Sequence, residues 1–559
     1  MMLSRWLPAS VRALRHYSLS YFTHDLIAGV TVGLVALPLA MAFAIASGLS
    51  PQSGIYCAIV TGFLVSALGG SRFQIGGPTG AFVVVVAGIA AQHGVSGLFM
   101  CTMMAGVMLV VLGATGMGTA VKYLPRPVVV GFTNGIAVLI ASTQIKDFFG
   151  LQVAAVPSEF WPRMVTLANN MNTITPAALA VAVSSLAVIL VLRRVVPAVP
   201  GTIVALLGGT VVVMWTGLDI QTIGSRFGGI PSGLPEMHIP KFEPHLIAPL
   251  VRPALTVAML GAIESLMSAV VADRMSGDRH NPNVELIAQG VANIASPIFG
   301  GLPATGAIAR TATNIRSGAR TPVAGMLHAV TLLVVLVAAA PLARFIPLAV
   351  LAAILLVVSY NMGEWHEIPR LLKLTKTDIS VWLVTFALTV FADLTLAVEV
   401  GMILAALLFI RKVAKTTTVA MVTAESIEAG RVHILQDKPI PPYVRIFRIH
   451  GPFLFGVTDK IARVTDHIDR LPSVVIVRLR NMTAIDATGL RALEDVALQL
   501  RQSGRTLVLC GAREQPAALM RAADFHQHVG HENILPNIAA ALERAREIHR
   551  SQSRTAAAR

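Results

Sequence analysis

Long apolar stretches fill most of the chain between Asp25 and Ile410, and they constrain its fold more than any other feature. A helix needs about 20 mostly apolar residues to cross a bilayer, and several of these stretches are that long. Charged residues make up only 13% of the chain, whereas soluble domains typically contain about 25%. After Arg411 the sequence has the composition of an ordinary soluble protein. We therefore predict a polytopic α-helical membrane protein with a soluble C-terminal domain.

This division predicts five consecutive parts. They are a cytoplasmic N-terminal segment (1–24), a transmembrane domain (25–410), a linker (411–442), a soluble α/β domain (443–548) and a disordered tail (549–559). The first part is basic and amphipathic and lacks the apolar core and cleavage site of a signal peptide, so we expect it to lead into the membrane as a helix.

Cysteine usage and net charge exclude some functions. Cys57, Cys101 and Cys510 are far apart and form neither a disulfide pattern nor a set of metal ligands, so no metal or other cofactor is expected. The net charge of +15 does not indicate nucleic-acid binding. Most basic residues lie beside apolar segments, where the positive-inside rule places them. No P-loop and no helical HExxH motif is found in the sequence, which argues against an ATP-driven pump or a metalloprotease.

The apolar pattern predicts fourteen membrane segments, so both termini lie on the same side. The segments are 26–46, 53–69, 78–91, 97–115, 127–145, 176–192, 200–217, 252–272, 284–299, 303–316, 322–341, 345–360, 377–391 and 394–410. The basic residues on the side of the termini are Arg5, Arg12, Arg15, Arg72, Lys122, Arg126, Arg193, Arg194, Arg274, Arg279, Arg316, Arg320, Arg370, Lys373, Lys376, Arg411, Lys412 and Lys415. Those opposite are Lys146, Arg163, Arg226, Lys241, Arg252 and Arg344. This asymmetry predicts an inner-membrane protein with both termini in the cytoplasm.

Two of the segments, 78–91 and 303–316, are too short to span, and they begin with related text. The first opens with GGPTGA from residue 76, and the second opens with GGLPATGA from residue 300. Pro78 and Pro303 are 225 positions apart, and the same offset relates the middle of the first segment to the eighth. Seven spans per half is an odd number, so the second copy must be inverted. Short segments interrupted by glycine and proline at matching places in two halves are typical of transporter binding sites.

The repeated text predicts two helix N-termini that face each other near the midplane. Proline suits the first turn of a helix, so Pro78 and Pro303 are predicted helix starts. Each start offers unpaired N–H groups and the positive end of a helix dipole, and together they would hold an anion. Six residues would form this pocket, namely Thr79, Gly80, Ala81, Thr305, Gly306 and Ala307. The alternative is that the small residues only allow close helix packing.

Charged residues inside the apolar region need a reason, because each costs about 2.5–3.5 kcal/mol or more at the midplane. Glu264 lies in the middle of the eighth segment, with Ser268 one turn later on the same face. Arg310 lies two turns into the predicted second short helix. Arg310 could form the positive wall of the anion site, with Glu264 as a proton carrier or substrate sensor. Alternatively, the two residues form an ion pair that joins the halves.

These motifs resemble the SulP anion transporter family. The resemblance includes DLIAGVTVGLVALPLAMAFAIASGLSPQSGIY from residue 25, GGPTGAF, GAIESLMSAVVAD, and GGLPATGAIARTATNIRSGARTPVAG, and it covers nearly the whole chain. It is greatest with the bacterial branch that contains C4-dicarboxylate transporters. The resemblance implies a 7+7 inverted repeat of the nucleobase-transporter type, with a core and a gate that work as an elevator, and a homodimer.

The resemblance also implies roles for single residues. It adds Phe43, an aromatic on the first span, to the anion site, and it matches Glu264 and Arg310 to family positions. Ala36 and Leu39 stand where animal members carry glutamines, and Thr79 stands where they carry an aromatic residue, so the animal anion preference does not transfer. Sodium-coupled members carry an aspartate and a threonine where this chain has Glu264 and Ser268, which favours coupling to H⁺ over Na⁺.

Residues 443–545 alternate between strand-like and helix-like text and resemble the STAS domain that ends SulP transporters. The predicted order is VRIFRIHGPFLFGV, a helix from Thr458, the strand 474–477, a helix opened by DATG from residue 486, the strand TLVLCG and a helix near 537–548. Thr488 matches the serine that is phosphorylated in related antagonist proteins, although a threonine at a helix start is more often a cap. His526, His528 and His531 are close in sequence but have little support as metal ligands.

We therefore expect a secondary transporter, and not an enzyme, that carries sulfate, bicarbonate or a C4-dicarboxylate with protons. An anion channel or exchanger on the same fold, or a membrane-anchored STAS scaffold, are the alternatives. The expected partners are the small anion, H⁺, the lipid bilayer, a second copy of the chain and a cytoplasmic protein at the STAS domain.

Overall fold

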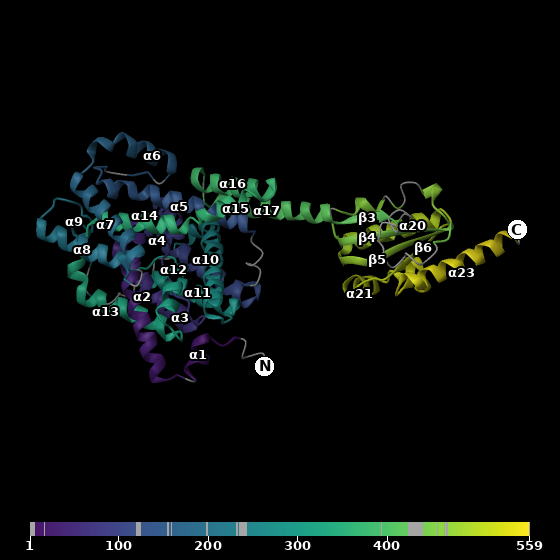
Figure 1. The fold of residues 1–559 in the computed structure, drawn as a ribbon, viewed down its shortest axis with the longest axis horizontal. Coiled ribbons are helices and arrows are strands. Elements are labelled where there is room, and N and C mark those ends of the chain that lie inside the picture. Colours follow the sequence, from purple (N-terminus) through teal and green to yellow (C-terminus); the bar gives the residue numbers. More distant parts are fainter. Residues whose placement is uncertain are drawn as a thin grey trace. The chain divides into compact units, whose positions relative to one another are not determined.

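The computed structural model describes residues 6–15, 17–118, 125–153, 156–157, 159–196, 199–230, 233, 237, 243–392, 394–422, 440–455, 457–462, 464 and 468–557. The chain forms two compact units, residues 1–403 and 404–559 (Figure 1). Most of the predicted linker (423–439) and the basic residues Arg5, Lys122 and Lys241 lie outside the described residues.

Helices make up the first unit. They are α1 (Ala9–Leu14), α2 (Leu19–Ala46), α3 (Pro51–Leu68), α4 (Gly80–Ala114), α5 (Arg126–Phe149), α6 (Phe160–Asn169), α7 (Pro176–Val195), α8 (Gly201–Thr216), α9 (Ile223–Phe227), α10 (Ile247–Ser276), α11 (Pro282–Ala295), α12 (Ile308–Arg316), α13 (Val323–Ala343), α14 (Leu348–Met362), α15 (Ile368–Leu371), α16 (Lys376–Phe391) and α17 (Leu394–Thr416). Every predicted membrane segment overlaps one of these helices. Eight helices in the described part of the chain are long and apolar enough to cross a membrane.

Two helix boundaries differ from the prediction for local reasons. α2 begins at Leu19 rather than 26, because the Ser18 side chain caps it by accepting a hydrogen bond from the Tyr21 N–H. The segments 78–91 and 97–115 form the single element α4, which is broken at Gly94 by a left-handed backbone (φ 69°). Glycine adopts this conformation without strain, which explains why the break falls there.

The long helices pack in two groups. In the first group, α4 packs against α10 and α11, and α13 packs against α2 and α3. In the second, α5 packs against α14 and α16, and α14 packs against α7. Small residues bring the helices close together: a Cβ on Gly106 of α4 would lie 2.7 Å from the carbonyl oxygen of Gly290 on α11.

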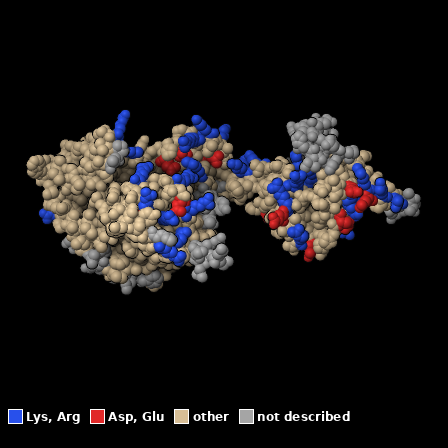
Figure 2. Space-filling model, turned by 60° about the horizontal axis from the view of Figure 1, so that its bottom comes forward, with Lys and Arg blue, Asp and Glu red and all other residues tan. Residues whose placement is uncertain are grey.

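The outer surface of the helical unit is largely apolar. In the view of Figure 2, much of this surface shows neither basic nor acidic residues. Large apolar side chains are exposed on it, such as Trp215 (92% exposed) and Leu207 (60%). A lipid-facing surface is expected to have this character.

Two short strands connect the halves of the helical unit. β1 (Gly76–Gly77) pairs antiparallel with β2 (Thr305–Gly306), and Gly76 lies opposite Gly306. Each strand leads directly into a helix, β1 into α4 and β2 into α12. Because the pairing is antiparallel, α4 and α12 leave this crossing in opposite directions, with their N-termini beside it. This arrangement agrees with the predicted inversion of the second half.

The prolines do not start these helices, contrary to the prediction. α4 begins at Gly80 and α12 begins at Ile308. Pro78 directly follows β1 and Pro303 lies two residues before β2, so neither proline is part of a helix. Arg310 is consequently the third residue of α12 and lies in its first turn, not two turns into the helix.

The second unit is a five-stranded sheet with helices. The strands are β3 (Thr418–Met421), β4 (Val444–Phe453), β5 (Val474–Ile485), β6 (Thr506–Cys510) and β7 (Ile534–Leu535), in that spatial order. β3 is antiparallel to β4, and the other neighbours are parallel. The helices are α19 (Asp459–Ala462), α20 (Ala487–Gln502), α21 (Glu514–Ala522), α22 (His526–Val529) and α23 (Ile538–Ala557).

The α/β order of this unit follows the prediction, with some differences. The strands β3 and β7 and the helices α21 and α22 were not predicted from the sequence. α23 continues to Ala557, so residues 549–557 are helical and the predicted disordered tail is wrong for them.

Candidate functional site

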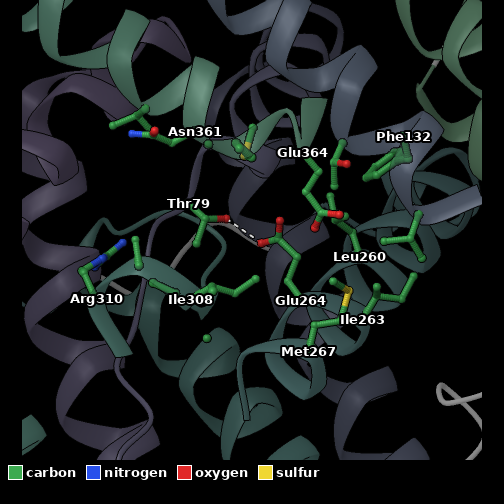
Figure 3. Close-up of a pocket in the computed structure, with 18 of the residues that line it drawn as sticks. Thr79, Phe132, Leu260, Ile263, Glu264, Met267, Ile308, Arg310, Asn361 and Glu364 are labelled. Atoms are coloured by element: carbon green, nitrogen blue, oxygen red, sulfur yellow. Dashed lines mark hydrogen bonds between the residues drawn. The ribbon is translucent and has the colours of Figure 1, made fainter. Parts of the chain in front are cut away.

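A cavity of about 320 Å³ lies between the two helix groups. Its walls are mostly apolar, and Figure 3 shows the side chains that project into it. The first helix group contributes Leu39, Phe43, Thr79, Gly80, Leu260, Ile263, Glu264, Met267, Gly306, Ala307, Ile308, Ala309 and Arg310. The second group and the segment after it contribute Val128, Val129, Phe132, Thr133, Val358, Asn361, Met362 and Glu364.

The start of α4 is joined to α10 at this cavity. Thr79 is the N-cap residue of α4, but its side chain does not cap the helix. Its hydroxyl instead donates a hydrogen bond to Glu264 Oε2 at 2.9 Å (Figure 3). The first amide groups of α4 therefore have no side-chain cap, and Glu264 is held beside them.

Arg310 lines the cavity but is only 2% exposed. Its Nη2 donates to the carbonyl oxygen of Pro78, and its Nη1 is buried without a partner in the described part of the chain. Gly77 makes room for this group, because a Cβ there would lie 2.3 Å from Nη1. Among the described residues no ion pair joins Arg310 to Glu264, so the structure does not contain the alternative ion pair considered above.

Some of the backbone N–H groups at the start of α12 donate hydrogen bonds to acceptors within the protein. The N–H of Gly306 donates to Ser265 Oγ at 3.1 Å, and the N–H of Ala307 donates to the Ile75 carbonyl at 2.8 Å. The next residues, Ile308 and Ala309, line the cavity. A helix leaves the N–H groups of its first turn without intrahelical acceptors, so these residues can offer them to a ligand.

The structure brings most of the predicted site residues together, but not all. Phe43, Thr79, Gly80, Gly306, Ala307, Arg310 and Glu264 line one cavity, whereas Ala81, Thr305 and Ser268 do not. The Thr305 hydroxyl lies 3.0 Å from the Gly261 carbonyl, to which it donates, and 2.7 Å from the Ser265 hydroxyl. Ser268 is fully buried and donates to Thr311. These two hydroxyls therefore hold α10 against β2 and α12.

Sequence analysis missed the second wall of the cavity. Asn361 and Glu364 lie at the end of α14 and just after it, and Thr133 lies on α5. Glu364 lies in the loop after an apolar segment, and acidic residues are common in such loops. Its sequence position alone therefore gave no signal that it faces a cavity.

The second unit contains Thr488 and the three histidines that the sequence analysis considered as candidate sites. Thr488 is exposed in the first turn of α20, and the cap is Asp486, whose carboxylate accepts a hydrogen bond from the Gly489 N–H at 2.8 Å. The rings of His526 and His531 stack at 3.9 Å, while His528 faces Glu494. In the part of the chain that the structure describes, no cluster of three or more potential ligands could hold a metal ion.

Comparisons with known proteins agree with this architecture. A family model described as the sulfate permease family matches residues 22–385, and one described as the STAS domain matches residues 436–542. The putative sulfate transporter YvdB of Bacillus subtilis is 41% identical over 525 residues, which cover 93% of this chain and 97% of YvdB. The bicarbonate transporter BicA of Picosynechococcus is 30% identical over 535 residues, which cover 93% of this chain and 94% of BicA.

Solved structures are also similar. The transmembrane domain of a cyanobacterial BicA matches with a TM-score of 0.61 and 33% identity, covering 70% of this chain and 98% of that one. The murine anion transporter Slc26a9 in an inward-facing state matches with a TM-score of 0.84 at 18% identity, covering 98% of this chain and 95% of that one, which shows a common fold. The chain therefore belongs to the sulfate permease family of membrane anion transporters and ends in a STAS domain.

Proposed function

We propose that the chain is a secondary active transporter that binds a small anion in the cavity beside the β1–β2 crossing. The observation that carries this proposal is the antiparallel pairing of Gly76–Gly77 with Thr305–Gly306. This pairing places the N-termini of α4 and α12 beside one cavity. Helix N-termini attract anions through unpaired N–H groups and the helix dipole. Glycine and alanine at positions 80, 306, 307 and 309 let a ligand approach the backbone.

Sulfate, bicarbonate and C4-dicarboxylates are the candidate substrates. The names of the relatives YvdB and BicA support the first two. The third comes from the resemblance of the sequence motifs to bacterial dicarboxylate transporters.

Glu264 is proposed to couple the anion to a proton. It is held by Thr79 at the start of α4, where we place the anion. A negative charge on Glu264 would repel an arriving anion, and this repulsion disappears when Glu264 binds a proton. The two ligands would therefore favour each other's binding, which is thermodynamic linkage. Arg310 does not pair with Glu264, so the coupling proposed here runs through this direct repulsion.

The movement, the assembly and the orientation are further parts of the proposal. The cavity is lined by both helix groups, so movement of the first group against the second would expose it alternately to each side of the membrane, as in an elevator. We further propose a homodimer in a bacterial inner membrane with both termini in the cytoplasm. The STAS domain is proposed to regulate transport, with Thr488 as an accessible position for modification and a cytoplasmic protein as partner.

Uptake by the purified full chain in proteoliposomes tests this function. The parent should accumulate anion against its gradient when protons flow inward, which a channel cannot do. Glu264→Gln keeps the size of the side chain but cannot exchange a proton, so it should bind and exchange anions without acceleration by the proton gradient. Glu159→Gln, at an exposed position before α6, is the matched control and should behave like the parent. Uptake by Glu264→Gln that rises with the gradient as steeply as in the parent would contradict the coupling.

A further inference from the structure

Glu364 is a second carboxylate of the cavity, in addition to Glu264. It follows α14 and reaches the cavity from the wall opposite Glu264. In Figure 3 the carboxyl groups of Glu264 and Glu364 point toward the same part of the cavity. An anion bound there would lie between α10, which carries Glu264, and the segment that carries Glu364.

The backbone holds Glu364 in an unusual conformation. Its φ is 41° and its ψ is 37°, in the left-handed region that residues with a Cβ rarely adopt. Among the described residues, only Asp524 is another non-glycine residue with positive φ. Strained backbone of this kind persists where the surrounding structure enforces it, and it is concentrated at functional sites.

The cation near Glu364 forms its ion pair with another residue. Arg126 on α5 is the nearby cation, but it forms its ion pair with Glu367 at 2.9 Å. Glu367 also binds Arg370 at 2.8 Å and His366 at 3.3 Å. Within the described part of the chain, the Glu364 side chain makes no hydrogen bond or ion pair, so it is free to accept one from a ligand.

The charges that line the cavity disfavour an anion with two negative charges. Among the described residues that line it, Glu264 and Glu364 are carboxylates and Arg310 is the one cation. Arg310 is almost fully buried and its Nη2 donates to the Pro78 carbonyl, so this single cation does not balance two carboxylates. Repulsion by a carboxylate is twice as large for a dianion as for a monoanion at the same distance. A monoanion that carries an O–H or N–H group can also donate a strong, charge-assisted hydrogen bond to Glu364.

We propose that Glu364 determines specificity by selecting monoanions that carry a hydrogen-bond donor over dianions. Bicarbonate and half-ionised dicarboxylic acids belong to the selected class, and sulfate belongs to the rejected one. This inference rests on the proposed binding of an anion in this cavity. It adds that the substrate itself brings a proton, which it shares with the Glu364 carboxylate by hydrogen bonding.

Three probes with the same tetrahedral sulfonyl group separate charge from hydrogen bonding. Sulfate is a dianion, methanesulfonate is a monoanion without a donor, and sulfamate is a monoanion with N–H donors. We would measure their binding to the purified full chain by calorimetry near neutral pH, with bicarbonate as a further ligand. The parent should bind sulfamate more tightly than methanesulfonate, and methanesulfonate more tightly than sulfate.

Two variants remove the charge at this position. Glu364→Gln keeps the length of the side chain, and Glu364→Asn suits the left-handed backbone and protects against a failure to fold. In both, the ratio of sulfate affinity to sulfamate affinity should rise by at least about tenfold, because the repulsion of the dianion is lost and the hydrogen bond from the donor is no longer strengthened by a negative charge. Glu159→Gln should leave the ratio unchanged.

The outcomes separate this inference from the proposed function. If the parent binds none of the four anions, the proposed anion site is wrong. If the parent binds anions but prefers sulfate to sulfamate, or if both variants keep the parent's ratio, the role of Glu364 is wrong while the anion site remains. The order measured for the parent decides even if both variants are unstable.

Discussion

Replacing Gly80 by alanine adds one methyl group where the two walls of the cavity meet. A Cβ at Gly80 would lie 3.0 Å from Ile140 Cδ1, 3.3 Å from Phe43 Cε1 and 3.4 Å from Met362 Cε. Ile140 is on α5 and Met362 ends α14, whereas Phe43 is on α2. All three contacts are with the ends of side chains, so small rotations can relieve them. The empty cavity beside these side chains gives them space to move into.

The cost of this methyl group should therefore appear in anion binding and not in stability. Gly80 is the first residue of α4 and does not have a positive φ, so alanine fits this position without backbone strain and α4 should stay folded. An anion that enters must push the displaced side chains back against the new methyl group. Overpacking of this kind costs about 1–3 kcal/mol, which corresponds to binding roughly 5- to 150-fold weaker.

Gly88 provides a matched control on the same helix. A Cβ at Gly88 would meet no atom of the described residues within 4 Å, so Gly88→Ala makes the same chemical change without such a contact. We would measure anion affinity by calorimetry and thermal unfolding of the parent and both variants. Gly80→Ala should bind more weakly at an unchanged or raised Tm, and Gly88→Ala should bind like the parent. Equal affinities of Gly80→Ala and the parent would refute the placement of the anion beside Gly80.

Three further changes test other parts of the structure. Thr79→Val removes the hydroxyl that donates to Glu264, so proton-driven uptake should fall about tenfold, as expected for a hydrogen bond of ~1.5 kcal/mol to a charged group. Thr79→Ser keeps the hydroxyl and should retain the uptake rate. A Thr79→Val rate equal to that of the parent would contradict the role of this hydrogen bond. A chain that ends after Lys415 should still insert and bind anion, because the helical unit is compact by itself; loss of binding by a stable truncated protein would show that the STAS domain contributes to the site. Burial raises the pKa of the Cys510 thiol from 9.0 to about 11. Alkylation by a maleimide at pH 8 should therefore be about 100-fold slower than in the denatured chain, and it should accelerate toward pH 11. Rapid labelling of the folded protein at pH 8 would contradict this.

The apolar segments, the inverted repeat and the α/β order of the second unit could be predicted because each depends on local pattern. The hydrogen-bond partners at the site could not. Thr79 and Glu264 are 185 positions apart, and no sequence pattern links them. The amide groups of Gly306 and Ala307 were expected to bind the anion, but Ser265 and Ile75 use them to hold the crossing together. Gly306 is needed for a different reason than expected, because a Cβ there would lie 1.9 Å from Gln74 Nε2.

The balance of charge in the cavity connects proton coupling with substrate selection. Among the described residues that line the cavity are two carboxylates and the guanidinium of Arg310, one amino group of which is bound to the Pro78 carbonyl. An incoming anion therefore meets negative charge that the helix N-termini only partly offset, since each is equivalent to about half a positive charge. A proton must reduce this repulsion, and it can arrive either on Glu264 from solution or on the substrate itself. The first route makes transport depend on the proton gradient, and the second makes it depend on the donor group of the substrate. Glu264 and Glu364 would thus solve the same electrostatic problem from opposite walls, which explains why an anion cavity contains two acids.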